Sequence, residues 1–416
     1  MSSFITELRP RRRAPSLGSA EARERWVHRR VGITWGLLFL NTLTFSSGTW
    51  NSLPLIVPIP TAIGKLLTQG ALPVALLLAL TVNRRIVIRP NVFLCLLSLL
   101  VVEAFVAGLH PAGHVIGTLY RTFRLAGFVA TLWLLTPWWG RRDMLLVKYQ
   151  LISFAVVLGT VLLGLFVAPG RALAGGRLSG EFWPMPPTKV ADLAAATLGL
   201  VIMMWLSGTM RGRASFAAVA VTAPILLLTH TRIELIAMLA GILVGGLSMF
   251  ISRARVRKSF VAAAIGLSVG ITIFSGVLTT WLARGQSSQE LGSLTGRTTV
   301  WAGVVNAPRD QFQVIFGYGL SNKSFNGLPI DSNWLATYYD LGLFGVFLCV
   351  ALVVFVFTSA YFQPRGPQRA LALFIVTYLA VTSLTETGLS DASTFLLLLA
   401  LAASLLVPPI TDWRPQ

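Results

Sequence analysis

The chain has 416 residues, of which 55% are hydrophobic and only 12% are charged, and its formal net charge is +19. A soluble protein carries about 25% charged residues, so this composition excludes a soluble globular domain and indicates a membrane protein. The excess of basic residues would also suit a nucleic-acid-binding protein, so the distribution of charge along the chain has to decide between the two.

Apolar runs recur along the whole chain, and each is long enough to cross about 30 Å of hydrocarbon as a helix. The runs are continuously apolar rather than alternating, which argues against a transmembrane barrel. We therefore predict an all-α, polytopic integral membrane protein with about 12 transmembrane helices. The predicted helices cover residues 31–50, 63–82, 91–109, 115–136, 144–168, 189–207, 214–230, 232–251, 259–281, 335–359, 368–386 and 393–409.

This prediction divides the chain into five parts. They are a basic cytoplasmic tail (1–30), helices one to nine (31–281), a large periplasmic loop (282–334), helices ten to twelve (335–409) and a short cytoplasmic tail (410–416). The segments on the side of the two termini hold 22 of the 34 lysines and arginines but only five of the 15 acidic residues. The positive-inside rule explains this asymmetry, so we expect both termini in the cytoplasm and no nucleic-acid partner.

The two cysteines, Cys95 and Cys349, both fall inside predicted helices. The sequence therefore predicts neither a disulfide framework nor a cysteine-containing metal site, and no metal or other cofactor is expected.

Helix four carries two arginines near its outer end, Arg121 and Arg124, which share one helical face because they are three residues apart. An arginine inside a membrane costs about 2.5–3.5 kcal/mol on insertion scales and usually faces the bundle interior or a wet cavity. Two explanations remain open for this pair. The arginines could form a structural salt bridge with Glu103 of helix three, or they could bind an anionic ligand from the outer leaflet.

Two further outer connections carry charged residues. Lys189 lies in the first turn of helix six, where a cation opposes the helix dipole unless an anion is nearby, which hints at a bound phosphate. The turn between helices seven and eight brings together His230, Arg232 and Glu234. His230 could act as an acid or base, or it could be a hydrogen-bonded structural histidine.

The loop 282–334 is the long polar segment between two blocks of apolar helices. Its middle part, Thr295–Val305, has four apolar residues at helical spacing and predicts an amphipathic helix on the membrane surface that ends before Pro308. Such a helix would bring Arg297 to the depth of the lipid headgroups. The end of the loop would then place Asp331 at the mouth of helix ten.

Several motifs follow one another on the predicted outer face. They are Arg177-Leu178-Ser179-Gly180 before a proline-containing helix start, Thr231-Arg232 at the opening of a helix, Gly296-Arg297 with Trp301, Asp331-Ser332-Asn333-Trp334-Leu335, and Asp340-Leu341-Gly342-Leu343-Phe344-Gly345. In this order, over about residues 170–390, they resemble the O-antigen ligase and Wzy-type polysaccharide polymerase superfamily of bacterial inner-membrane glycosyltransferases.

The resemblance implies a donor glycan on undecaprenyl pyrophosphate, which is transferred to another lipid-linked repeat or to lipid A core without a metal or a nucleotide sugar. It also implies an active site at the periplasmic face and a chain-length regulator and a flippase as partners. On the matching positions it implies Asp331 as the base and Arg177, Arg232 and Arg297 as pyrophosphate ligands. Further candidates on the same face are Arg121, Arg124 and Lys189 for the pyrophosphate, with His230, Asn333, Asp340 and Glu386 in supporting positions.

The chemistry of the residues agrees with these roles. A pyrophosphate that leaves an anomeric carbon develops negative charge, and arginine offers paired donors that stabilise this charge without proton transfer. A sugar hydroxyl is a weak nucleophile, so a positioned carboxylate assists its attack. Ligases of the superfamily resemble one another in a histidine where this chain has Asp331, and this difference favours a polymerase, with a ligase as the alternative.

Two other classes remain as rivals. Many twelve-helix secondary transporters have a long cytoplasmic connection between helices six and seven, whereas residues 208–213 form a short one here. The sequence also shows no pair of broken helices around a midplane site. A scaffold protein leaves the recurrent outer-face arginines unexplained.

Overall fold

A computed structural model of the chain describes most of its length. The described residues are 17–45, 53–109, 115–283 and 297–408. Within them the protein is almost entirely helical, and the strands are two short ones, β1 (Ser324–Phe325) and β2 (Leu328–Pro329). The mostly helical fold class is therefore confirmed.

The helices follow the apolar runs along the chain, and each of the twelve predicted helices overlaps one of them. They are α1 (Leu17–Thr42), α2 (Thr61–Val82), α3 (Val92–Gly108), α4 (Val115–Leu135), α5 (Leu145–Val167), α6 (Pro169–Ala172), α7 (Pro187–Leu206), α8 (Gly212–Leu228), α9 (Arg232–Leu247), α10 (Ala254–Ala283), α12 (Arg297–Asn306), α13 (Gln311–Phe316), α14 (Asn333–Phe362), α15 (Pro367–Thr382) and α16 (Thr394–Leu406). Two 3₁₀ turns, η1 (Thr136–Trp138) and η2 (Ala174–Gly176), lie between them.

Within the described residues, four helices are both long and apolar enough to cross a membrane, namely α2, α5, α7 and α14. The apolar helices α3, α8, α15 and α16 are shorter, at 10 to 17 residues. Length and composition therefore support membrane association. The full set of twelve spans and the periplasmic side of the long loop stay predictions.

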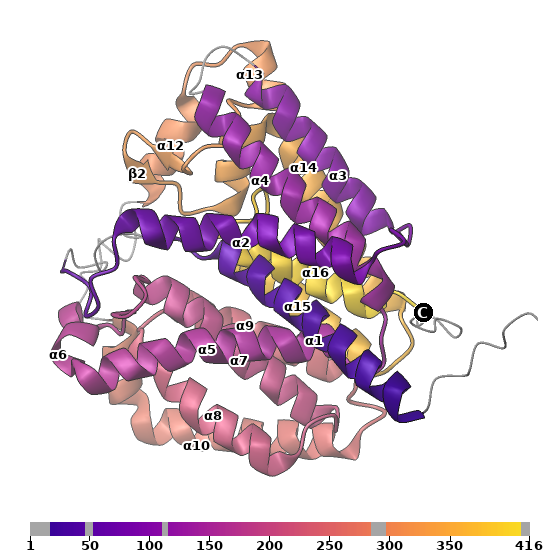
Figure 1. The fold of residues 1–416 in the computed structure, drawn as a ribbon. Helices are drawn as coiled ribbons and strands as arrows, with labels where there is room; N and C mark the ends of the chain where they lie inside the picture. Colours follow the sequence, from indigo (N-terminus) through magenta and orange to yellow (C-terminus); the bar gives the residue numbers. More distant parts are fainter. Residues whose placement is uncertain (1–16, 46–52, 110–114, 284–296, 409–416) are drawn as a thin grey trace, which may run out of the picture.

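Three helices form the centre of the molecule. Nearly every residue of α16 is buried, and most residues of α7 and α15 are buried as well. Figure 1 shows α15 and α16 in the middle, with α5, α7, α8, α9 and α10 gathered below and α3, α4, α12, α13 and α14 above.

The first helix differs from its prediction. It begins at Leu17, inside the segment expected to be a tail, and ends at Thr42 rather than near residue 50. Alanine, glutamate and arginine, which favour helices, are frequent in residues 17–30, and this explains the early start. The rest of the basic tail and the C-terminal residues 409–416 lie outside the described residues.

Helix α14 is broken at Gly342, where the backbone has φ 62° and ψ −163°. Only glycine adopts this conformation without strain, and a Cβ at this position would lie 2.3 Å from the backbone of Ile315. The helix predicted as one rod over 335–359 is therefore two segments. Asp340 lies near the end of the first segment, two residues before the break.

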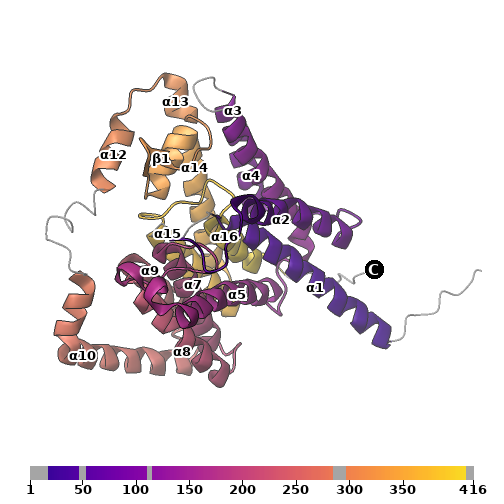
Figure 2. The same cartoon turned by 60° about the vertical axis from the view of Figure 1, so that its left-hand side comes forward.

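The described part of the long loop folds into α12, α13 and the hairpin of β1 and β2, beside the start of α14 (Figure 2). A small core of Val304, Ile330 and Ala336 joins these elements, and Val300 packs against it. The helix predicted for this loop is thus present as α12, but packing within the protein already uses part of its apolar face. The predicted helix start, Thr295 and Gly296, lies outside the described residues.

Candidate functional site

Arg177 follows η2 and is fixed to the turn between α8 and α9. Its Nε donates to the carbonyl of Thr229 at 2.9 Å, and its Nη2 donates to the hydroxyl of Thr231 at 3.1 Å. Arg232 is the next residue after Thr231 and the first of α9. The fold therefore brings Arg177 to the start of the helix that carries Arg232. His230 forms this turn in a left-handed conformation with φ 50°.

Arg297 reaches the same region from α12. Its Nε donates to Asp331 Oδ2 at 3.1 Å, just before α14 begins. Burial lowers the pKa of Arg177, and the nearby charge of Arg297 lowers it further, so the two guanidinium groups lie close enough to repel each other. Two arginines from distant parts of the sequence therefore lie within electrostatic reach of each other, and Arg297 is paired with the predicted base, Asp331.

Asp331 remains accessible in this arrangement, with 39% of its side chain exposed. Burial raises the pKa of Asp331, whereas the charge of Arg297 opposes the rise and that of Glu386 supports it. A carboxylate with a raised pKa is a better base near neutral pH than a fully solvated one. Its environment therefore fits the role that the resemblance implied.

A second ion pair lies beside Asp331. Lys189 Nζ lies 3.2 Å from Glu386 Oε2, and the charge of Lys189 also reaches Asp331. Lys189 is the third residue of α7, and Glu386 belongs to the segment after α15. Glu386 is thus the anion that offsets the unfavourable position of Lys189 in the first turn of α7. The position of Lys189 therefore does not by itself indicate a bound phosphate.

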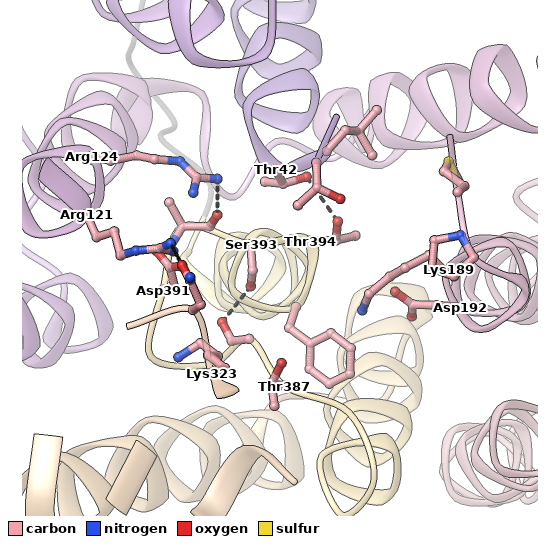
Figure 3. Close-up of a pocket in the computed structure, with 18 of the residues that line it drawn as sticks. Thr42, Arg121, Arg124, Lys189, Asp192, Lys323, Thr387, Asp391, Ser393 and Thr394 are labelled. Carbon is pink, nitrogen blue, oxygen red and sulfur yellow. Dashed lines mark hydrogen bonds between the residues drawn. The ribbon is translucent and has the colours of Figure 1, made fainter. Parts of the chain in front are cut away.

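A cavity of about 230 Å³, lined by charged residues as well as apolar ones, opens next to Lys189. In Figure 3, Arg121 and Arg124 of α4 face it from one side, Lys189 and Asp192 of α7 from the opposite side, and Lys323 from a third. Its other polar lining residues include Thr42, Ser321, Asn322, Thr387, Asp391, Ser393 and Thr394. The cavity therefore gathers three predicted phosphate ligands, but not Arg177, Arg232 or Arg297.

The two arginines of α4 differ in how they are bound. Arg124 donates to the side chain of Asn41 at 3.2 Å and to the carbonyls of Asn41 and Ala392 at 2.7 and 2.8 Å. Arg121 donates through Nη2 to the side chain of Asn322. The alternative of pairing with Glu103 is wrong, because neither arginine contacts it and its buried Oε1 has no hydrogen-bond partner within the described residues.

Asn333 is a structural anchor. Its Oδ1 accepts hydrogen bonds from the backbone of Gly388 at 3.1 Å and of Leu389 at 2.8 Å, and its own backbone donates to Ser383 at 2.9 Å. The side chain is fully buried. It therefore holds the start of α14, next to Asp331, against the segment that carries Glu386.

Asp340 is also an anchor rather than a lining residue. Its carboxylate accepts hydrogen bonds from Ser321 at 2.7 Å and from Lys323 Nζ at 3.0 Å, and it is fully buried. Lys323 also donates to Ser390 at 3.0 Å. This network fixes residues 321–323 at the edge of the cavity, and it was not foreseen from the sequence.

The sequence analysis also missed a buried group below Lys189. Tyr378 of α15 lies between two carboxyl groups, Asp192 of α7 and Glu234 of α9. Charged residues inside apolar helices are a recognised sign of function, so Asp192 could have been singled out, whereas Glu234 was noted only for its place beside His230 and Arg232. Nothing in the sequence distinguishes Tyr378.

The predicted site residues thus form two neighbouring groups. Arg177, Arg297 and Asp331 make one, Arg121 and Arg124 line the cavity, and the Lys189–Glu386 pair lies between them. No protein-family model matches the sequence, and no curated protein matches it. The geometry of the site therefore carries the functional argument.

Proposed function

We propose that the chain is a metal-independent membrane glycosyltransferase that polymerises undecaprenyl-pyrophosphate-linked repeat units into a surface polysaccharide at the periplasmic face of a bacterial inner membrane. We place it in the O-antigen ligase and Wzy-type polymerase superfamily. One observation carries the proposal: Arg297 of α12 pairs with Asp331 before α14, and the charge of Arg297 also acts on Arg177, which comes from a third segment.

The arginines favour an anionic ligand. Among the described residues Arg297 uses only Nε, for Asp331, and Arg177 uses Nε and Nη2, for Thr229 and Thr231. Terminal nitrogens of both guanidinium groups thus remain available as donors. Two like charges held together cost free energy, which an anion between them would recover, and arginine is well suited to phosphate oxygens.

In the proposed reaction the acceptor sugar hydroxyl attacks the anomeric carbon of the donor glycan. The new carbon–oxygen bond forms while the bond to the pyrophosphate oxygen breaks, and its electron pair stays on the pyrophosphate. Asp331 takes the hydroxyl proton, and Arg177 and Arg297 stabilise the added negative charge. No other reactant is needed for atoms and charges to balance.

The test is complementation of a deletion strain with single variants. Asp331→Asn should lower polymer formation by about 10²–10⁴-fold, because it removes the base, and Arg297→Gln by about 10²–10³-fold, because it removes a charge-stabilising donor. Arg213→Gln is the matched control, since Arg213 is exposed at the start of α8, on the predicted cytoplasmic side. Wild-type polymer from normally expressed Asp331→Asn protein would overturn the role of Asp331.

Glycan analysis of the deletion strain separates the two transferase reactions. Accumulation of single lipid-linked repeats means that a polymerase has been lost. Full-length polymer that stays on the carrier lipid means that the protein is a ligase acting on lipid A core, and it would replace the polymerase proposal.

Proton-coupled transport is the second candidate, and the buried Asp192, Glu234 and Tyr378 group is the observation that favours it. Purified protein in proteoliposomes distinguishes the classes. A transferase forms new glycosidic bonds between lipid-linked glycans without an ion gradient. A transporter moves its substrate only when a proton gradient is present and makes no new bond.

A further inference from the structure

Three buried polar side chains meet where α7, α9 and α15 pack together. The Tyr378 hydroxyl oxygen lies 2.7 Å from Asp192 Oδ1 and forms a second hydrogen bond with Glu234 Oε2. It also lies 3.1 Å from the Asp192 carbonyl oxygen. Asp192 is 1% exposed, and Glu234 and Tyr378 are fully buried. The group is thus closed off from lipid and bulk solvent on most sides.

The number of hydrogens in this group decides its charge. A phenol has one hydrogen and can donate it to one of the two carboxyl groups. The other carboxyl group can form its hydrogen bond with Tyr378 only if it carries a proton and donates it to the phenol oxygen. Two carboxylates that share one buried site also repel each other, so one proton on the pair is favoured.

The neighbouring charges do not remove the need for this proton. Lys189 of α7 and Glu386 of the segment after α15 are the other charged groups that act on the pair, and they neutralise each other at 3.2 Å. With both Asp192 and Glu234 ionised, the buried region would carry two negative charges in excess. One shared proton lowers this excess to a single charge.

Two further observations point to an exchangeable proton. Asp192 Oδ2 and Glu234 Oε1 are buried and have no hydrogen-bond partner within the described residues, so each can take up a proton without breaking a contact. Asp192 also lines the cavity beside Lys189 (Figure 3), whereas Glu234 and Tyr378 are not among the residues that line it. The cavity therefore gives the group a route to water.

We propose that Asp192, Tyr378 and Glu234 form a proton-binding site, in which the two carboxyl groups share one proton through the phenol and exchange it with the cavity through Asp192. This inference is independent of the transferase proposal. The ligand of this group is a proton, and the proton enters and leaves through the cavity. Under either proposed function, a proton could thus be held within the helix core, one turn of α7 below Lys189.

Infrared difference spectroscopy of the purified full-length protein in nanodiscs tests the proposal. At neutral pH, wild type should show the C=O stretch of a protonated carboxyl group that is absent from both Asp192→Asn and Glu234→Gln. Either single substitution should remove the band, because the new amide can donate a hydrogen to the phenol oxygen in place of the shared proton and the remaining carboxylate then accepts the phenol hydrogen. Tyr378→Phe should shift the band, since the hydrogen bond of the shared proton is lost.

Glu103→Gln is the matched control, because Glu103 is another buried carboxyl group with an unpartnered oxygen and belongs to α3. It should leave the band of the triad unchanged. In heavy water the wild-type band should shift as the proton exchanges through the cavity. A band that persists in one single variant would mean an independently protonated carboxyl group, and no band, or one that never shifts, would also overturn the proposal.

Discussion

At the scale of single residues, the charged side chains around the site differ in how many of their donors the protein itself uses. Arg124 is bound to Asn41 and Ala392 through three hydrogen bonds, and its role is to hold α4 against α1 and the segment before α16. Within the part of the chain that the structure describes, Arg297 uses one nitrogen, for Asp331. The number of hydrogen bonds that a guanidinium group makes within the protein therefore separates structural arginines from candidate ligand-binding ones. The sequence alone does not distinguish the two types.

The pH dependence of glycan transfer should reflect Asp331. Because burial raises its pKa and a base must be ionised, activity should fall on acidification at a pH above the value of about 4 for a solvated aspartate. Arg297→Gln removes a charge that lowers this pKa, so the acid limb of the pH–rate profile should move to higher pH. An unchanged acid limb in this variant would contradict the assignment.

The stability effect of Asp331 has the opposite sign. A carboxyl group whose pKa is raised on folding binds its proton more tightly in the folded state, so its ionisation costs stability as the pH rises. Activity and stability should therefore change in opposite directions across the titration of Asp331, and thermal unfolding at several pH values can be compared directly with the pH–rate profile.

The buried ion pair of Lys323 and Asp340 should be strongly non-additive. Asp340→Ala or Lys323→Met leaves one buried charge without its partner, which costs about 3–5 kcal/mol of unfolding free energy. The double variant should lose clearly less than the sum of the two. Thermal unfolding in detergent measures the cycle, and additive losses would mean that the pair is not coupled.

At the scale of elements, the break in α14 decides where the site lies. The first segment carries Asn333 and Asp340, which anchor the long loop, and Gly342 allows the chain to turn into the second, apolar segment. Had α14 been a single rod, Asp340 would lie inside the membrane helix. The sequence contains this glycine, but its positive φ is required only by the close approach of α13.

Gly342→Ala should therefore destabilise the protein. The left-handed backbone costs about 1–3 kcal/mol for a residue with a Cβ, and the contact with Ile315 adds to this. Gly159→Ala in α5 is the control, because a Cβ at Gly159 meets nothing within 4 Å. That variant should be neutral or more stable by about 0.5–1 kcal/mol. Size-exclusion chromatography after heating compares the two, and equal stability would contradict the strained turn.

At the scale of the whole molecule, the basic residues and the site residues are segregated. The connections predicted to lie on the same side of the membrane as the two termini hold 22 of the 34 lysines and arginines. The candidate site residues lie in or next to the connections predicted on the other side. This distribution predicts that the termini face the cytoplasm and the site faces the opposite side.

Cysteine labelling can test this topology because the chain has only two cysteines, Cys95 and Cys349. In a background with both changed to serine, Leu328→Cys in the hairpin should react with an impermeant maleimide added to intact cells. Arg84→Cys, in an exposed connection on the predicted cytoplasmic side, should react only after the membrane is opened. The reverse pattern would overturn the predicted orientation.

The helical class, the approximate positions of the helices and the expected sidedness could all be predicted from the amino-acid sequence, because these depend on local apolar runs and on charge counts. The sequence also pointed to Arg177, Arg297 and Asp331 through short motifs. Only the tertiary structure decided which charges are neutralised within the chain, such as Lys189 by Glu386, and which buried groups meet, such as Asp192, Glu234 and Tyr378. Such pairings join helices distant in the sequence, so they depend on packing rather than on any local pattern.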